Sequence, residues 1–461
     1  MILRDYQVKF LAGISEAHKN GHQGVVGEMP TGAGKTVCMA RIVRSIAERS
    51  GKALIVVHRS ELLHQTIDKL KLFGVPFGVI SSKSENPRPN APVQVAMVQT
   101  LARRIKRGVI GEWVFHYIIL DEAHLAAANS YKIITDWQPK ARRLGLSATP
   151  WRLDGRGLSD VGTAIVKGPT VQELIDLGSL VKFTTYSPAI ADLSRVKKNF
   201  SGEYDLEQQA EEYKKADVIG DVIRHYKLLA NGQPFIAFCS TVEHSMLTRD
   251  RFVEIGLRVE HIDGETKPDR RNLIIAKLNA GIIDGVTNCG CLTEGFDCPR
   301  VSCVMVIRKT ASSALWRQMG GRCLRPFNGK LYATILDFGN NAENHGNFGH
   351  IYQYALDGKP KKPSEKLCRT CPRCSAVCAI SQLVCHVCSY DFTFVDKKER
   401  TIVEVDGELV PIDFDSAPVE KKVEKKGEVP AHFMKREKRE ALIEDFFSTH
   451  GISRTNNRST I

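Results

Sequence analysis

The sequence has no apolar run that approaches the roughly 20 residues a helix needs to cross a lipid bilayer. This absence argues against a membrane protein. Residues 1–5 also lack the basic start, apolar stretch and small-residue cleavage site of a secretory signal peptide. We therefore expect a cytoplasmic protein. No internal sequence repeat is evident.

Acidic residues are the scarcer charged class: 52 Asp and Glu stand against 65 Lys and Arg, which leaves a formal net charge of +13. This balance favours a polyanionic partner, because each Lys or Arg near a phosphate releases condensed counterions. Hydrophobic residues make up 43% of the chain and charged residues 25%, as in ordinary soluble globular proteins. At 461 residues the chain exceeds what one hydrophobic core sustains, so we expect two or three domains.

Short apolar runs alternate with helical patterns in two stretches of the chain, which predicts two α/β domains with parallel sheets. The candidate strands are residues 24–26, 53–57, 93–96, 117–120, 235–238, 259–262, 301–307 and 332–336. The predicted boundaries are 1–170 and 218–357 for the two α/β domains, 171–217 for a polar linker or insertion, 366–395 for a cysteine-rich module and 400–461 for a partly disordered tail.

The segment Met29-Pro30-Thr31-Gly32-Ala33-Gly34-Lys35-Thr36 follows a short apolar strand and precedes a helical pattern, the setting that a phosphate-binding loop requires. Its glycines allow backbone amides to approach phosphates, Lys35 neutralises phosphate charge, and the Thr36 hydroxyl is a magnesium ligand. An ordinary glycine-rich turn is the alternative. The predicted nucleotide-contacting residues are Thr31, Gly32, Ala33, Gly34, Lys35 and Thr36.

Two carboxylates, Asp121 and Glu122, directly follow the apolar run 117–120 in the tetrapeptide Asp121-Glu122-Ala123-His124. Ligand sites in α/β proteins form at the carboxyl ends of parallel strands. Asp121 is predicted to hold magnesium, Glu122 to orient or deprotonate the attacking water, and His124 to couple the site to the neighbouring domain. In isolation, such a tetrapeptide is more often a solvated helix start.

Six of the 13 cysteines fall between residues 368 and 388, a clustering that indicates metal binding. The predicted zinc ligands form two C-x-x-C pairs, namely Cys371, Cys374, Cys385 and Cys388. Cys368, Cys378 and His386 are further candidate ligands, and a redox dithiol is the alternative function. The other seven cysteines lie mostly in or beside apolar runs and are interpreted as small buried hydrophobic residues.

Further segments resemble, in order, the motifs of superfamily 2 helicases of the DEAH type. Leu3 to Gln7 resembles the adenine-reading motif, 146–150 the third motif, 293–297 the fifth and 318–325 the sixth. This resemblance implies two tandem RecA-like domains that bind ATP and Mg²⁺. By the match, Arg4 and Gln7 contact adenine, Gly295 and Asp297 line the cleft, and Arg322 and Arg325 are arginine fingers. Alone, these arginines would more often be surface charges or ion-pair partners.

The same resemblance identifies candidate contacts to a nucleic-acid backbone, namely Arg59, Thr100, Thr241 and Thr293. Such contacts predict strong salt dependence and little sequence preference. A threonine at a strand end is otherwise more often a cap or turn residue.

Together with the zinc ribbon, the motif order resembles the bacterial RadD family and its phage-encoded relatives. The resemblance implies a DNA helicase or translocase in repair, recombination or replication, with single-stranded, forked or duplex DNA as partner and contact with single-stranded-DNA-binding protein. RNA is a less favoured partner. The alternatives are an RNA helicase and an ATP-switched protein that clamps DNA or remodels a partner without separating strands.

Overall fold

The computed structural model describes most of the chain between residues 3 and 393. The described ranges are 3–82, 88, 90–110, 113–125, 128–149, 152, 157–188, 193, 195–199, 202–215, 218–293, 296–348, 356 and 368–393. The expected tail at 400–461 lies outside them. Among the helices in these ranges, none has the length and apolar character required to cross a membrane.

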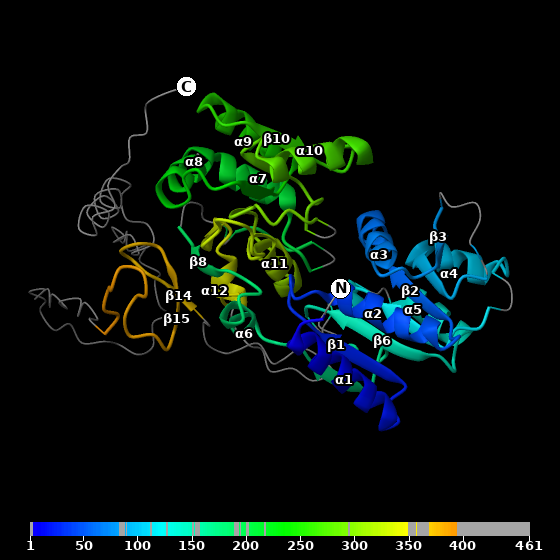
Figure 1. Ribbon diagram of the computed structural model, residues 1–461. Coiled ribbons are helices and arrows are strands. Elements are labelled where there is room, and N and C mark those ends of the chain that lie inside the picture. The colour runs from blue at the N-terminus through cyan, green and yellow to red at the C-terminus, as the bar shows by residue number, and fades with distance from the viewer. Residues whose placement is uncertain are drawn as a thin grey trace, which may run out of the picture.

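The first domain is built on a parallel sheet of seven strands (Figure 1). These are β1 (Gly24–Glu28), β2 (Ala53–Val57), β3 (Phe77–Ile80), β4 (Val93–Met97), β5 (Tyr117–Leu120), β6 (Arg142–Ser147) and β7 (Ala164–Lys167), in the order β3-β4-β2-β5-β6-β1-β7. The helices of this domain are α1 (Asp5–Lys19), α2 (Lys35–Glu48), α3 (Ser60–Leu72), α4 (Val98–Lys106) and α5 (Ala128–Trp137). Strands β2 and β5 are buried along their whole length, which explains their continuous apolar sequences.

The second domain has a parallel sheet of six strands. These are β8 (Lys182–Tyr186), β9 (Phe235–Cys239), β10 (Val259–Ile262), β11 (Gly285–Asn288), β12 (Cys303–Ile307) and β13 (Tyr332–Asp337), in the order β10-β11-β9-β12-β13-β8. The helices are α6 (Val171–Asp176), α7 (Leu206–Lys215), α8 (Val218–Leu229), α9 (Val242–Glu254), α10 (Pro268–Ala280), α11 (Ser313–Gly320) and α12 (Asn341–His345). The prediction of an α/β protein with two parallel sheets is therefore confirmed.

The segment 171–217, expected to be a linker or insertion, contributes structure to the second domain. Strand β8 lies in it and pairs in parallel with β13, with Lys182 opposite Tyr332 and Tyr186 opposite Leu336. Its sequence, Lys-Phe-Thr-Thr-Tyr, lacks the apolar run of a central strand because β8 is an edge strand. The second sheet thus begins before residue 218.

The cysteine-rich module contains a short antiparallel pair, β14 (Cys368–Thr370) and β15 (Val377–Ala379). It is attached to the carboxyl end of β8, where Tyr186 forms an antiparallel bridge with Ala376. The Ser187 amide extends this pairing by donating to the Ser375 carbonyl at 2.9 Å. In Figure 1 the module lies beside the second domain, next to β8 and α12.

The sheet order of the first domain brings three sequence motifs to neighbouring strand ends. Strand β6 lies between β1 and β5, with Glu28 opposite Ser147 and Leu120 opposite Gly145. The phosphate-loop motif follows β1, the two acidic residues follow β5, and Ser147 ends β6. Because all three strands run in parallel, the motifs meet at one edge of the sheet.

Candidate functional site

The segment from Met29 to Thr36 forms a loop that leads into α2. Gly32 and Gly34 have φ angles of 87° and 91°, a conformation that favours glycine, and Gly34 is the N-cap of α2. Lys35 starts the helix, and its ammonium donates to the Met29 carbonyl at 3.2 Å. The loop therefore presents the positive end of a 14-residue helix together with a lysine, which is the arrangement that binds phosphate.

The start of α1 packs directly on this loop. The Tyr6 hydroxyl and the Gln7 amide both donate to the Ala33 carbonyl, at 3.0 and 3.3 Å. Gln7 is fixed in turn by the Arg4 backbone amide, which donates to its Oε1 at 3.0 Å. A Cβ added at Gly34 would lie 2.5 Å from the Gln7 Nε2. The predicted adenine-reading residues Arg4 and Gln7 thus lie beside the predicted phosphate loop.

The two carboxylates after β5 are buried, at 5% exposure for Asp121 and 8% for Glu122. Glu122 has a φ of 48°, a strained conformation for a non-glycine residue of the kind found at functional sites. Its Oε1 lies 3.7 Å from the Lys35 Nζ, and its Oε2 is buried without a hydrogen-bond partner. Burial opposes ionisation of this carboxyl, but the charges of Lys35, His124 and Arg322 outweigh burial and lower the pKa of Glu122. Glu122 is therefore a carboxylate with one oxygen available.

His124 links Glu122 to the end of β6. Its Nδ1 lies 3.5 Å from the Glu122 Oε2 and 2.8 Å from the Ser147 Oγ. The Ser147 Oγ also accepts from the Thr149 amide at 3.0 Å. Burial lowers the pKa of His124, although the charge of Glu122 opposes this shift. The His124 Nε2 and the Thr149 Oγ1 are buried without hydrogen-bond partners, so polar atoms remain available at this edge.

Two residues near this site were not singled out from the sequence. The His58 Nε2 lies 2.7 Å from the Tyr131 hydroxyl, and burial lowers the pKa of His58 to about 4. Glu28 ends β1, and burial raises its pKa to about 7 although Arg317, Lys167 and Lys35 oppose the shift. Both residues are far in sequence from most of the groups that act on them. The only sequence signal for their role is position, since His58 directly follows β2 and Glu28 ends β1.

Arginines of the second domain lie against the phosphate loop of the first. Gly321 packs so closely on the loop that an added Cβ would lie 2.8 Å from the Thr31 Cβ. The next residue, Arg322, contributes positive charge at Glu122, and its guanidinium donates to the Phe296 carbonyl at 2.7 Å. Arg325 forms an ion pair with Asp297, and its Cγ lies 3.7 Å from a Cβ built on Gly32. Both predicted fingers are thus beside the nucleotide loop.

The predicted backbone-contacting residues occupy both domains. The Arg59 guanidinium crosses to the second domain and donates to the Gly290 carbonyl at 3.3 Å. Thr100 is partly exposed on α4. Thr241 caps α9 by accepting from the His244 amide, and Thr293 is buried, with its carbonyl accepting from Arg322. Gly295, predicted to line the cleft, lies outside the described residues.

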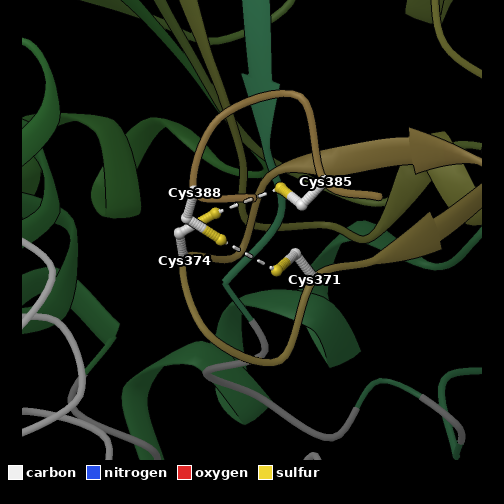
Figure 2. Close-up of side chains that lie close together, drawn as sticks. All are labelled: Cys371, Cys374, Cys385 and Cys388. Carbon is white, nitrogen blue, oxygen red and sulfur yellow. Dashed lines mark hydrogen bonds between the residues drawn. The ribbon is translucent and has the colours of Figure 1, made fainter. Parts of the chain in front are cut away.

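The four cysteines predicted as zinc ligands converge in the third module (Figure 2). All four sulfurs lie within 4.8 Å of one another, with 3.5 Å between Cys371 and Cys388 and 3.7 Å between Cys374 and Cys385. Zinc–sulfur bonds of about 2.3 Å in tetrahedral geometry place sulfurs about 3.8 Å apart. These spacings fit such a site, and they are far longer than the roughly 2.05 Å of a disulfide.

The two C-x-x-C segments have the same backbone geometry. Ser375 and Ser389, the residues after each pair, have φ angles of 61° and 56°. Their amides donate to the first cysteine of each pair, Cys371 or Cys385, at 2.9 Å. Cys371 and Cys385 also donate through their own amides to carbonyls five residues later, both at 2.8 Å. This repeated turn directs all four thiols to one point.

The additional candidate ligands differ in their proximity to this cluster. The Cys378 sulfur lies 3.8 Å from the Cys385 sulfur and 3.6 Å from the His386 Nδ1. Cys368 is buried at the start of β14 and does not belong to the group of four. The geometry therefore favours the four cysteines of the two C-x-x-C pairs, with Cys378 directly beside them.

Comparison with known proteins assigns families to both α/β domains. Residues 1–152 match the type III restriction enzyme res subunit family, and residues 214–326 match the helicase conserved C-terminal domain. A 51.5 kDa protein of a Lactococcus phage is 30% identical over 389 residues, which cover 83% of this chain and 81% of that protein.

A Saccharomyces cerevisiae protein, provisionally named the ATP-dependent helicase IRC3, is 31% identical over 357 residues, which cover 73% of this chain and 51% of that protein. This chain therefore spans about half the length of the yeast relative. The solved structure of the ATP-dependent type ISP restriction-modification enzyme LlaBIII bound to DNA shares the fold, with a TM-score of 0.54. That match has 17% identity and covers 73% of this chain and 27% of the other.

Proposed function

Because the chain belongs to the superfamily 2 helicases, we propose that it couples ATP hydrolysis to movement along DNA or to remodelling of DNA. The two helicase domains make it a nucleic-acid-dependent ATPase. One observation carries the proposal: the Lys35 ammonium lies 3.7 Å from the Glu122 carboxylate, and the charge of Arg322 acts on the same carboxylate, although the three residues come from three separate motifs and two domains. An ATP bound there would contact residues of both domains, so hydrolysis can change how the domains sit together.

The proposed chemistry assigns one task to each charged group. Lys35 neutralises the β- and γ-phosphates, and the amides at the start of α2 bind their oxygens. Glu122 orients the attacking water through its available oxygen and accepts the proton. Arg322 and Arg325 stabilise charge on the transferring phosphoryl group, which requires that they exchange their present carbonyl and carboxylate partners for phosphate oxygens. Gln7 contacts adenine.

Two metals fit the residues present. Magnesium, when bound, would neutralise phosphate charge. Thr36, in the first turn of α2, and Asp121, buried at the end of β5, are the hydroxyl and carboxylate that would hold it. Zinc is a structural ion in the proposal, and the four convergent sulfurs would hold it without leaving an open position for catalysis.

We propose that the protein moves along DNA and that Arg59, Thr100, Thr241 and Thr293 contact the DNA backbone. The net charge of +13, the res subunit family match and the likeness to a structure bound to DNA support this choice. The DEAH-type motif order and the cysteine module support a RadD-like role in repair, recombination or replication, with single-stranded-DNA-binding protein as a partner. We also propose that the protein works in the cytoplasm.

The test is ATP hydrolysis by the purified protein, measured without nucleic acid and then with single-stranded, duplex or forked DNA or with RNA, at two salt concentrations. We expect strong stimulation by one DNA form that weakens at higher salt. Glu122→Gln should abolish this turnover while ATP binding persists. Glu16→Gln is the matched control, because Glu16 is exposed on α1 and should behave as wild type.

Stimulation by RNA alone would replace DNA with RNA as the track. Hydrolysis indifferent to every nucleic acid would contradict the motor and point to an ATP switch driven by a protein partner. Wild-type turnover in Glu122→Gln would remove the assignment of Glu122 as the residue that activates water.

A further inference from the structure

A short basic hairpin lies at the start of the second domain, outside every helicase motif. We call residues 195–199 and 202–205 the basic hairpin. Lys198 and Tyr204 form an antiparallel bridge, and the Asp205 amide donates to the Lys197 carbonyl at 2.9 Å. The Asn199 amide closes the turn by donating to the Glu203 carbonyl at 2.7 Å. The hairpin leads directly into α7.

The basic hairpin is fixed to the loop that follows β12. The Glu203 carboxylate accepts from the Thr310 hydroxyl at 2.8 Å and from the Ala311 amide at 2.7 Å. The Gln209 side chain on α7 bonds both the amide and the carbonyl of Lys309, at 2.7 and 3.1 Å. Four hydrogen bonds to the consecutive residues 309–311 hold the hairpin and the start of α7 in one orientation, so the side chains of the hairpin are presented by a rigid support.

Three of the exposed side chains of this hairpin are basic. Arg195, Lys197 and Lys198 are all exposed. Lys198 and Lys309 gather at the Tyr204 ring, with their ammonium groups 5.1 and 4.8 Å from its centroid.

The hairpin's three basic residues exceed its two carboxylates, and both carboxylates form hydrogen bonds of the local fold. Glu203 anchors the hairpin to the loop after β12, and Asp205 accepts from the Gln208 amide at 2.9 Å at the start of α7. The exposed charged side chains within the hairpin are therefore cations, whereas its two carboxylates are only partly exposed.

The hairpin lies at the same edge of the sheet as Thr241. Strands β12 and β9 are neighbours in parallel, with Ile307 opposite Cys239, so the loops that follow them are adjacent. Helix α7, which follows the hairpin, runs toward the start of α9, since the Lys214 ammonium near its carboxyl end lies 3.0 Å from the Glu243 carboxylate, two residues after Thr241. A DNA strand bound at the carboxyl end of β9 would therefore lie next to the basic hairpin.

We propose that the basic hairpin is a further DNA-binding element of the second domain, in which Lys198 and its neighbours bind phosphates of a single strand beyond Thr241. This inference rests on the proposed function. Three observations favour binding of a polyanion: the rigid support of the hairpin, its neighbouring ammonium groups, and its position near Thr241. The backbone of single-stranded DNA is the polyanion that the proposed function places at this edge of the sheet. The contact does not depend on the DNA sequence, and it increases the affinity of the second domain for DNA.

The test compares two exposed lysines of the second domain. Lys198→Gln removes a cation from the hairpin, whereas Lys227→Gln removes one from the last turn of α8, which precedes β9 and so lies at the opposite edge of the sheet. The affinity of each full-length protein for labelled oligo-dT is measured by fluorescence anisotropy across a salt series. We expect Lys198→Gln to weaken binding several-fold and to reduce the slope of log Kd against log salt by roughly 0.7, the value for one phosphate contact. Lys227→Gln should match wild type.

A second variant tests whether DNA binding depends on the fixed position of the hairpin or only on the overall positive charge of the protein. Glu203→Ala makes the protein more basic by one unit but removes the anchor of the hairpin. The placed contact predicts weaker DNA binding, whereas nonspecific attraction predicts stronger binding. Basal ATP hydrolysis without DNA should be unchanged in Lys227→Gln.

The inference is overturned if Lys198→Gln binds DNA as well as Lys227→Gln does, or if Glu203→Ala binds more tightly than wild type. A loss confined to RNA would also overturn it. Failure of the proposed function gives a different result, since wild-type protein would then bind no oligo-dT and DNA would not stimulate its ATPase.

Discussion

The packing of α1 on the phosphate loop can be tested by adding one methyl group. In Gly34→Ala, the new Cβ would lie 2.5 Å from the Gln7 Nε2, so Gln7 must move. Moving it breaks two hydrogen bonds, from Gln7 to the Ala33 carbonyl and from the Arg4 amide to Gln7. Gly34 also has a φ of 91°, which an alanine adopts only at a cost.

The conformational cost has a matched control in Gly256→Ala. Gly256 has a φ of 89°, and a Cβ built there meets nothing within 4 Å. We expect this variant to lose about 1–2 kcal/mol of unfolding free energy, from backbone strain alone. Gly34→Ala should lose roughly 1–3 kcal/mol more, because each broken hydrogen bond contributes about 0.5–1.5 kcal/mol. The difference between the variants therefore isolates the contact with Gln7.

Urea unfolding gives the two stabilities, and titration with a fluorescent ATP analogue gives nucleotide affinity. We expect Gly34→Ala to raise the nucleotide Kd about tenfold or more, since 1.4 kcal/mol corresponds to a factor of ten. Gly256→Ala should leave the Kd unchanged. Equal stability and equal affinity in the two variants would refute the argument that Gln7 and Gly34 form one packed unit of the nucleotide site.

Three further predictions concern the metal, the buried acid and the serine at the end of β6. Metal analysis should find about one zinc per chain, retained in Cys368→Ser but lost in Cys385→Ser; zinc retained in both would contradict the four-cysteine set. The pKa of Glu28 is about 7 in the folded protein against 4.5 ordinarily, so the folded state holds the proton more tightly and unfolding free energy should fall by about 3 kcal/mol as pH rises from 4.5 to 7. In Glu28→Gln, the urea midpoint of unfolding should depend less on pH between 4.5 and 7. An unchanged slope of the midpoint against pH would disprove the role of Glu28. Ser147→Ala should lower kcat for ATP with little change in KM, because it removes the partner of His124; a rise in KM alone would point to nucleotide binding instead.

Fully buried strands could be predicted from the sequence, because their burial requires a continuous apolar run. Strands β2, β5, β9 and β12 are buried throughout, and their apolar runs predicted them. Strand β6 begins with two arginines, and β8 and β11 are short and rich in polar residues, so local sequence gave no comparable signal. These strands are specified by their neighbours in the sheet, and neighbours far apart in sequence are not visible in a local pattern.

The site shows the same division. Contiguous motifs could be recognised because the chemistry constrains adjacent residues, as in the loop around Lys35 and the pair Asp121 and Glu122. Contacts between distant segments could not, such as the pairing of His58 with Tyr131 or the shifted pKa of Glu28, which depends on burial. The roles assigned to the site residues remain predictions, whereas their proximity is a property of the fold.

Strand β8 gives the cysteine module a physical connection to the nucleotide site. At its amino end, the Val181 amide donates to the Leu324 carbonyl at 2.9 Å, beside Arg325, and the Leu180 side chain reaches within 3.0 Å of a Cβ built on Gly32. At its carboxyl end, Tyr186 packs against the cysteine cluster.

Because β8 is an edge strand with β13 as its sheet neighbour, the cysteine module supplies much of the support at its outer end. Loss of the zinc ligands in Cys385→Ser should therefore loosen β8 as well as the module. Hydrogen exchange at the amides of residues 182–186 should accelerate in that variant and not in Cys368→Ser. Unchanged protection of β8 would show that pairing with β13 alone holds the strand, and that the cysteine module is an appendage without mechanical influence on the motor.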